Sequence, residues 1–156
     1  YGVASIVGLI CLKIFEVEGR DVKRAAILLG RAMQLTNILR DIKSDAKRDR
    51  LYLPLDEIEA FELTEKEVLK GVPSSRLEKF LHFQLHRTEE IYHKAFETFD
   101  ALPRKPLLPA RIMGKVYWEI LNEIHHNPLG SFQRKVKLSK LTHLRIIFLE
   151  WIRSYL

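Results

Sequence analysis

The chain has 156 residues, and 47% of them are apolar, which suits one folded domain with a buried core and argues against disorder. Lys and Arg number 26 against 20 Asp and Glu, and the net charge of +6 favours anionic partners such as diphosphates, anionic lipid surfaces or nucleic acid. One cysteine, Cys11, rules out a disulfide framework, and no apolar run is long enough to span a membrane, so we expect a cytoplasmic protein.

Helical periodicity runs along the whole chain, and no strand-like alternation survives between the turn signals. Residues 1–15 are apolar nearly all round and predict a buried helix. A long helix is predicted from Arg20 or Asp21, with Asp21 as its N-cap. Thr64 and Glu67 form a capping box, and Gly71 ends the short helix that follows. Further helices are predicted over residues 55–61, 73–102, 110–126 and 138–156. We therefore predict one all-α domain over residues 1–156.

The last predicted helix has an apolar side and a basic side. Its apolar side carries Leu141, Leu144, Ile147, Phe148, Trp151, Ile152 and Tyr155. One interpretation is a surface helix that packs on the core. The other is a basic amphipathic segment that contacts a membrane surface.

A narrow polar stripe marks the second half of the long helix. At about 100° per residue, Gln34, Asn37, Asp41 and Asp45 fall within roughly 80°. The two carboxylates repel each other, and they lie late in their helix, where the helix dipole disfavours negative charge. A cation should offset both costs. It could be a hard divalent ion, which prefers oxygen ligands, or the neighbouring basic side chains of Arg40, Lys43, Lys47, Arg48 and Arg50.

The stretch QLTNILRDIKSDAKRDRLYLP, residues 34–54, resembles the second aspartate-rich motif of the squalene/phytoene synthase family. The matching residues are Gln34, Asn37, Arg40, Asp41, Asp45, Arg50, Tyr52, Leu53 and Pro54. The family usually has Gly where this chain has Asp49. Residues 1–15, 108–124 and 134–140 resemble the family's VAxxVG helix, its late RIM…Y helix and its closing basic segment. The sequences of residues 1–15 and 108–124 are most similar to those of bacterial presqualene diphosphate synthases of hopanoid and squalene biosynthesis.

This resemblance implies an isoprenoid synthase-like helical bundle that is incomplete at the N-terminus. The family uses two aspartate-rich motifs, and only the second is found here, so the missing N-terminal segment would be a partner of this chain. The implied activity is that of a prenyltransferase that condenses two prenyl diphosphates head to head. Farnesyl diphosphate would give presqualene diphosphate or squalene, and geranylgeranyl diphosphate would give phytoene.

The resemblance also implies roles for individual residues. Asp41, Asp45 and Asn37 would hold Mg²⁺, with Mn²⁺ as an alternative, and Tyr52 would face the reacting substrate. Gln34, Asn37, Arg40, Tyr117 and Arg134 would bind diphosphate. The wall of the prenyl pocket would be formed by Val3, Ala4, Val7, Leu29 and Met33. NADPH would be needed only if the reaction proceeds to squalene. Each residue also has an ordinary structural interpretation, as a core residue or a surface charge.

Two rival functions stay open from the sequence. The chain could be a basic helical module that binds RNA or an acidic partner, or a non-catalytic truncated synthase. No nucleic-acid partner is expected, because the positive charge is not gathered into one stripe and no nucleic-acid-binding motif is present. The expected location is cytoplasmic, with peripheral contact at the inner membrane face.

Overall fold

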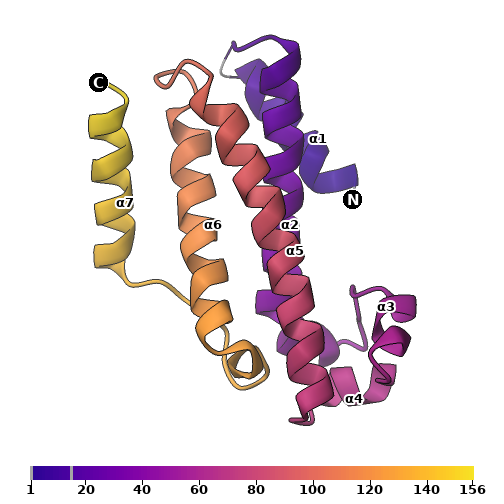
Figure 1. Cartoon of the computed structure of the whole chain (residues 1–156). Helices are drawn as coiled ribbons and strands as arrows, with labels where there is room; N and C mark the ends of the chain where they lie inside the picture. Colours follow the sequence, from indigo (N-terminus) through magenta and orange to yellow (C-terminus); the bar gives the residue numbers. More distant parts are fainter. Residues whose placement is uncertain (1, 15) are drawn as a thin grey trace.

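The computed structural model describes residues 2–14 and 16–156, and leaves out the side chains of residues 2–5 and 7. Within the described residues the chain is helical and contains no strand, which confirms the all-α prediction (Figure 1). The helices in chain order are α1 (Gly2–Ile14), α2 (Arg20–Ala46), α3 (Leu55–Ala60), α4 (Glu65–Lys70), α5 (Ser75–Asp100), α6 (Leu108–His126), the 3₁₀ helix η1 (Pro128–Phe132) and α7 (Lys140–Arg153).

The long helix α2 is the centre of the fold, because α1, α5 and α6 all pack against it. Figure 1 shows α5 and α6 beside α2, with α7 beyond α6 and with α3 and α4 near the C-terminal end of α2. The contact with α1 is close: a Cβ added at Gly8 would lie 2.9 Å from the carbonyl oxygen of Ala26. Small residues at this crossing therefore allow the two helices to approach.

The core between α2 and α5 also contains a polar contact that fixes how α2 is rotated. The hydroxyls of Thr36 and Tyr92 are 3.0 Å apart, and both residues are fully buried. The Tyr92 ring also lies near Phe96 and Trp118, with centroids 5.7 and 5.5 Å away. Because Thr36 precedes Asn37, this contact determines the direction in which the polar stripe faces.

Most predicted helix ends agree with the structure. The capping box of Thr64 and Glu67 is present, and Gly71 ends α4 with a left-handed φ of 61°. The predicted N-cap of α2 is wrong. Gly19 occupies that position with a φ of 137°, which L side chains rarely adopt, and Asp21 lies inside the first turn. The Asp21 carboxylate there can still interact favourably with the helix dipole.

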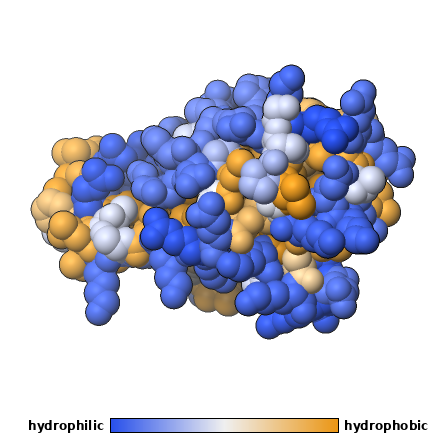
Figure 2. All heavy atoms as spheres, turned by 90° about the horizontal axis from the view of Figure 1, so that it is seen from below, coloured by the Kyte–Doolittle hydropathy of each residue, from blue (hydrophilic) through white to orange (hydrophobic). Residues whose placement is uncertain are grey.

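The helix α7 packs on α6, but through the opposite side from the one expected. Its buried residues are Ile146 and Glu150, with 5% and 4% of their surface exposed. The expected apolar side is exposed, with Leu144 at 63% and Phe148 at 59%. Figure 2 shows hydrophobic atoms at the end of the molecule where α7 lies. No helix of the described residues is long and apolar enough to cross a bilayer.

Candidate functional site

The polar stripe lies on the C-terminal half of α2, beside the helices that hold α2 in place. Apolar residues of this half face the core, namely Leu35, Leu39 and Ile42. The stripe is therefore turned away from the core centre: Gln34 is exposed, and Asn37, Asp41 and Asp45 are half-buried. The structure thus brings these four residues onto one face, as their spacing predicts.

Asp41 is the most heavily paired residue of the stripe. Arg40 donates from Nε to Oδ1 at 3.0 Å and from Nη2 to Oδ2 at 2.9 Å, and the Lys135 ammonium lies 2.9 Å from Oδ1. Partial burial alone would raise the pKa of Asp41. The hydrogen bonds from Arg40 and Lys135 outweigh it and hold that pKa below its usual value. The carboxylate is therefore ionised and held between two cations.

Arg40 connects α2 to α6. Its guanidinium lies 5.9 Å from the centroid of the Tyr117 ring, on the α6 face turned toward α2. The hydrogen bond to Asp41 raises the pKa of Arg40, although partial burial opposes that change. Two predicted diphosphate ligands, Arg40 and Tyr117, thus lie together beside a predicted metal ligand. A planar guanidinium presents several N–H donors in a geometry that suits phosphate oxygens.

Asn37 has an unusual environment for a polar side chain. Its Oδ1 is buried and accepts no hydrogen bond from any described residue. Buried polar atoms are nearly always paired, so an orphaned amide oxygen one helical turn before Asp41 calls for a partner. With Asp41 and Asp45 it forms a set of oxygen donors, the type that Mg²⁺ and Mn²⁺ prefer. These residues fit a divalent metal, and ligands from outside this set would complete its coordination shell. No group of three or more His, Cys, Asp or Glu forms a metal site within the described residues.

The pairing of Lys135 with Asp41 was not predicted. The sequence indicated the adjacent Arg134, which is exposed and has no ion-pair partner among the described residues. Lys43, one of the predicted counter-cations, instead donates to the backbone carbonyl of Gln133 at 2.5 Å. A basic segment after η1 was visible in the sequence, but its register against α2 was not.

The other predicted residues lie at varying depths. Tyr52 follows the end of α2 and is 53% exposed. Leu29 is buried in the core, and Met33 is half-buried against it. Val3, Ala4 and Val7 belong to α1, and their side chains lie outside the described residues. Their role as a prenyl-pocket wall stays a prediction.

The turn after α2 explains the one departure from the family motif. Asp49 has a φ of 53°, in the left-handed region that glycine adopts freely and that Asp and Asn adopt more readily than other residues. The glycine usual in the family thus meets a backbone requirement that Asp49 also meets. The chain then turns away from the stripe, with the Arg50 N–H donating to the carbonyl of Asp45.

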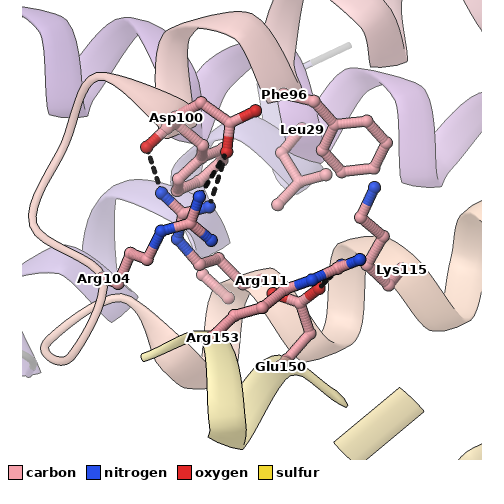
Figure 3. Close-up of a pocket in the computed structure, with 10 residues that line it drawn as sticks. Leu29, Phe96, Asp100, Arg104, Arg111, Lys115, Glu150 and Arg153 are labelled. Carbon is pink, nitrogen blue, oxygen red and sulfur yellow. Dashed lines mark hydrogen bonds and ion pairs between the residues drawn. The ribbon is translucent and has the colours of Figure 1, made fainter. Parts of the chain in front are cut away.

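One cavity adjoins the site, and a larger one lies away from it. A basic cavity of about 110 Å³ adjoins Asp41 and is lined by Arg40, Lys43, Ser44, Lys47, Ser131 and Lys135. A larger cavity of about 250 Å³ lies at the other end of the helices, where α5 ends and α6 begins (Figures 1 and 3). Figure 3 shows two groups of ion pairs among its lining residues: Asp100 with Arg104 and Arg111, and Glu150 with Arg153. The pairs of Asp100 connect the end of α5 to the start of α6, whereas Glu150 and Arg153 pair within α7. These ion pairs give the cavity a structural explanation.

Comparison with known proteins identifies the class to which this fold and stripe belong. Residues 1–142 match the family model described as squalene/phytoene synthase. The chain therefore belongs to the squalene/phytoene synthase family. A crystal structure of a dehydrosqualene synthase in complex with ligand has the same fold, with a TM-score of 0.73 and 26% sequence identity. That match covers 86% of this chain and 48% of the other, and confirms the isoprenoid synthase-like bundle.

Curated relatives include phytoene synthases from bacteria and plants. The phytoene synthase of Arthrospira platensis is 36% identical over 86% of this chain and 48% of its own length. The chloroplastic phytoene synthase of Narcissus pseudonarcissus is 32% identical over all of this chain and 38% of its own length. The chain thus spans about half or less of the length of these relatives. The finer resemblance to presqualene diphosphate synthases stays a prediction.

Proposed function

We propose that this chain forms the part of a prenyltransferase that carries the second aspartate-rich motif of the active site. The intact enzyme would join two prenyl diphosphates head to head with the help of a divalent metal. One observation carries the proposal: the buried, unpartnered oxygen of Asn37 lies on the same helix face as Asp41 and Asp45. Buried polar atoms are nearly always paired, so this oxygen calls for a partner, and a divalent metal would supply one.

The chain's own residues would bind and orient the diphosphate of the substrate. Asn37, Asp41 and Asp45 would hold Mg²⁺ or Mn²⁺. When bound, the metal supplies Lewis-acid stabilisation of the negative charge that gathers on the departing diphosphate. Arg40 is paired with Asp41 and lies over the Tyr117 ring, and both side chains can donate to diphosphate oxygens. Gln34 and the exposed Arg134 can donate to the same diphosphate. These donors surround the place where negative charge develops.

The remaining part of the reaction needs a dry, apolar space. Loss of diphosphate leaves an allylic cation, which water would quench. Leu29 and Met33 precede the stripe on α2 and would lie along the prenyl chain, together with Val3, Ala4 and Val7 of α1. Tyr52 would face the reacting carbons, where an aromatic ring can stabilise positive charge. Other regions of the intact enzyme would close this space.

The substrate is proposed as a C15 or C20 prenyl diphosphate. Farnesyl diphosphate would give presqualene diphosphate, and on to squalene only with NADPH, whereas geranylgeranyl diphosphate would give phytoene. The resemblance of the first and late helices to presqualene diphosphate synthases favours the C15 substrate and a stop at the first product. The phytoene synthases among the relatives favour the C20 substrate.

The test uses a version of the protein that extends over the full length of its relatives. Each substrate is supplied with Mg²⁺, and diphosphate release and lipid products are measured for the parent protein and for Asp41→Asn, Asp45→Asn and Asn37→Ala. We expect the parent protein to show metal-dependent turnover, and each of the three variants to fold normally but to lose it. Turnover that survives in Asp41→Asn would refute the assignment. Salt-sensitive RNA retention without any metal effect would favour the rival RNA-binding function.

We also propose that α7 contributes to a peripheral membrane contact of the intact protein at the cytoplasmic face. Its outward side is apolar, including Leu144, Phe148 and Trp151, and Arg145 and Arg153 flank that side. Such a helix can lie in the interface of an anionic bilayer. The alternative occupant of this side is another segment of the intact synthase. If the full-length protein sediments with anionic vesicles and Phe148→Gln abolishes this, α7 contacts the membrane. If the full-length protein does not sediment with the vesicles, the other occupant is favoured.

A further inference from the structure

The ion pair between Lys135 and Asp41 occupies an atom that a metal would need. Lys135 Nζ lies 2.9 Å from Asp41 Oδ1, and the same oxygen accepts from Arg40 Nε at 3.0 Å. Oδ1 is therefore surrounded by positive charge, and Oδ2 is held by Arg40 Nη2. A divalent cation approaching Asp41 would be repelled by both side chains unless one of them moved away.

Lys135 can move away more easily than Arg40. Arg40 is on α2 itself, its side chain is only 15% exposed, and it lies over the Tyr117 ring. Lys135 is 49% exposed and lies in the irregular segment between η1 and α7. A lysine carries a compact charge on a flexible four-carbon stem, so its ammonium can change partner without any movement of a helix. Partly exposed ion pairs also contribute little stability, so this pair is easily exchanged.

The surroundings also keep the displaced ammonium close to the stripe. Lys43 on α2 donates to the carbonyl of Gln133, which tethers the chain two residues before Lys135. Lys135 also lines the basic cavity beside Asp41, together with Lys43 and Lys47. An anion held next to Asp41 would lie within reach of this ammonium, and phosphate oxygens are strong acceptors for lysine.

We propose that Lys135 is an exchangeable counter-cation that holds Asp41 when no divalent metal is bound, and transfers to diphosphate when metal and diphosphate bind together. This inference rests on the proposed function of the stripe as a metal-diphosphate site. Its consequence is cooperativity. Metal alone must break the ion pair, whereas metal with diphosphate gives Lys135 a new partner. By linkage, each ligand then strengthens the binding of the other by the same factor.

Lys135→Gln removes the ammonium and keeps most of the side-chain length. Protein-bound Mn²⁺ is measured by equilibrium dialysis at a buffered free Mn²⁺ concentration, with and without inorganic diphosphate. Because a partly exposed ion pair is weak, we expect Lys135→Gln to tighten binding of Mn²⁺ alone by about two- to five-fold. In the presence of diphosphate we expect Mn²⁺ binding to weaken by about ten-fold, because a charge-assisted hydrogen bond is lost. Lys135→Arg should restore most of the cooperativity.

The matched control is Lys137→Gln, which removes the same charge from an exposed residue of the same segment. It measures the general effect of net charge and should change neither measurement by more than about two-fold. If Lys135→Gln behaves like Lys137→Gln, or weakens binding in both measurements, the inference is overturned and the proposed function stands. If the parent protein binds no Mn²⁺ with diphosphate, or Asp41→Asn binds as well as the parent, both are overturned.

Discussion

The buried contact between Thr36 and Tyr92 allows a sharp test of how α2 is held in the fold. Thr36 Oγ1 has one hydrogen and donates it to the carbonyl of Ala32 at 2.9 Å. The 3.0 Å contact with Tyr92 must therefore be donated by the tyrosine hydroxyl. Burial raises the pKa of Tyr92 well above its usual value, so this hydroxyl stays protonated. The two partners are thus unequal: the Tyr92 O–H depends on Thr36 for its acceptor, whereas the Thr36 O–H has its own acceptor at Ala32.

Thr36→Val leaves the Tyr92 O–H without an acceptor in the core, and such an unpaired group costs about 1–3 kcal/mol. Tyr92→Phe removes the donor itself, leaves the bond from Thr36 to Ala32, and should cost only about 0.5–1.5 kcal/mol. The double variant leaves no unpaired donor, so its cost should be well below the sum of the two single costs. For a domain of this size, a loss of about 2 kcal/mol lowers the Tm by about 4–8 °C.

The free energy of unfolding is measured by urea titration followed by circular dichroism, with a thermal scan beside it. Thr98→Val is the matched control, since the Thr98 hydroxyl makes the same type of bond to the carbonyl four residues earlier, at 2.8 Å, with no tertiary partner. It should change stability little. A Thr36→Val variant no less stable than Thr98→Val, or a double variant as costly as the sum, would refute the donor assignment.

Three further predictions follow from the site and the surface. The pKa of Asp41 is lowered, so its ion pairs stabilise the fold above the ordinary carboxyl pKa, and this contribution disappears as the pH falls through the lowered value. Urea titrations at several pH values should therefore show a smaller acid-side decrease in the free energy of unfolding for Asp41→Asn than for the parent protein. In the full-length enzyme, Arg134→Ala should lower kcat by about 10²–10³ with an unchanged melt, because a cation facing developing charge is lost; a normal kcat would make Arg134 a surface charge. The 156-residue chain alone should release no diphosphate from farnesyl diphosphate, and its exposed α7 side should bind a hydrophobic dye, less so in Phe148→Gln; turnover by a clean monomer would contradict this.

Local signals in the sequence predicted most of the secondary structure because they act within one turn of chain. The capping box of Thr64 and Glu67 and the left-handed Gly71 need only neighbouring backbone groups, and both are present. The prediction for Asp21 failed because Gly19, two residues earlier, already supplies the bend into α2. A cap depends on the backbone conformation at one residue, and Asp, Ser or Thr nearby does not reveal which residue that is.

The face of a helix was predictable, whereas its partner was not. Spacing alone placed Gln34, Asn37, Asp41 and Asp45 on one stripe, because the helical repeat is a property of the backbone. Periodicity likewise revealed an apolar side on α7, but the structure turns that side outward and buries Glu150 instead. An amphipathic pattern shows which face of a helix is apolar. Tertiary packing decides whether that face is buried and which element packs against it.

The sequence by itself determined that this protein is all-α, that it belongs with the squalene/phytoene synthases, and that two carboxylates and an amide share one face of a long helix. Only the tertiary structure decided which cations Asp41 meets. Arg40 could be expected from its position in the motif, but Lys135 lies 94 positions after Asp41, and its ammonium reaches the carboxylate only because η1 turns the chain back along α2. A contact between such distant residues depends on how the helices pack, and no local pattern encodes that register.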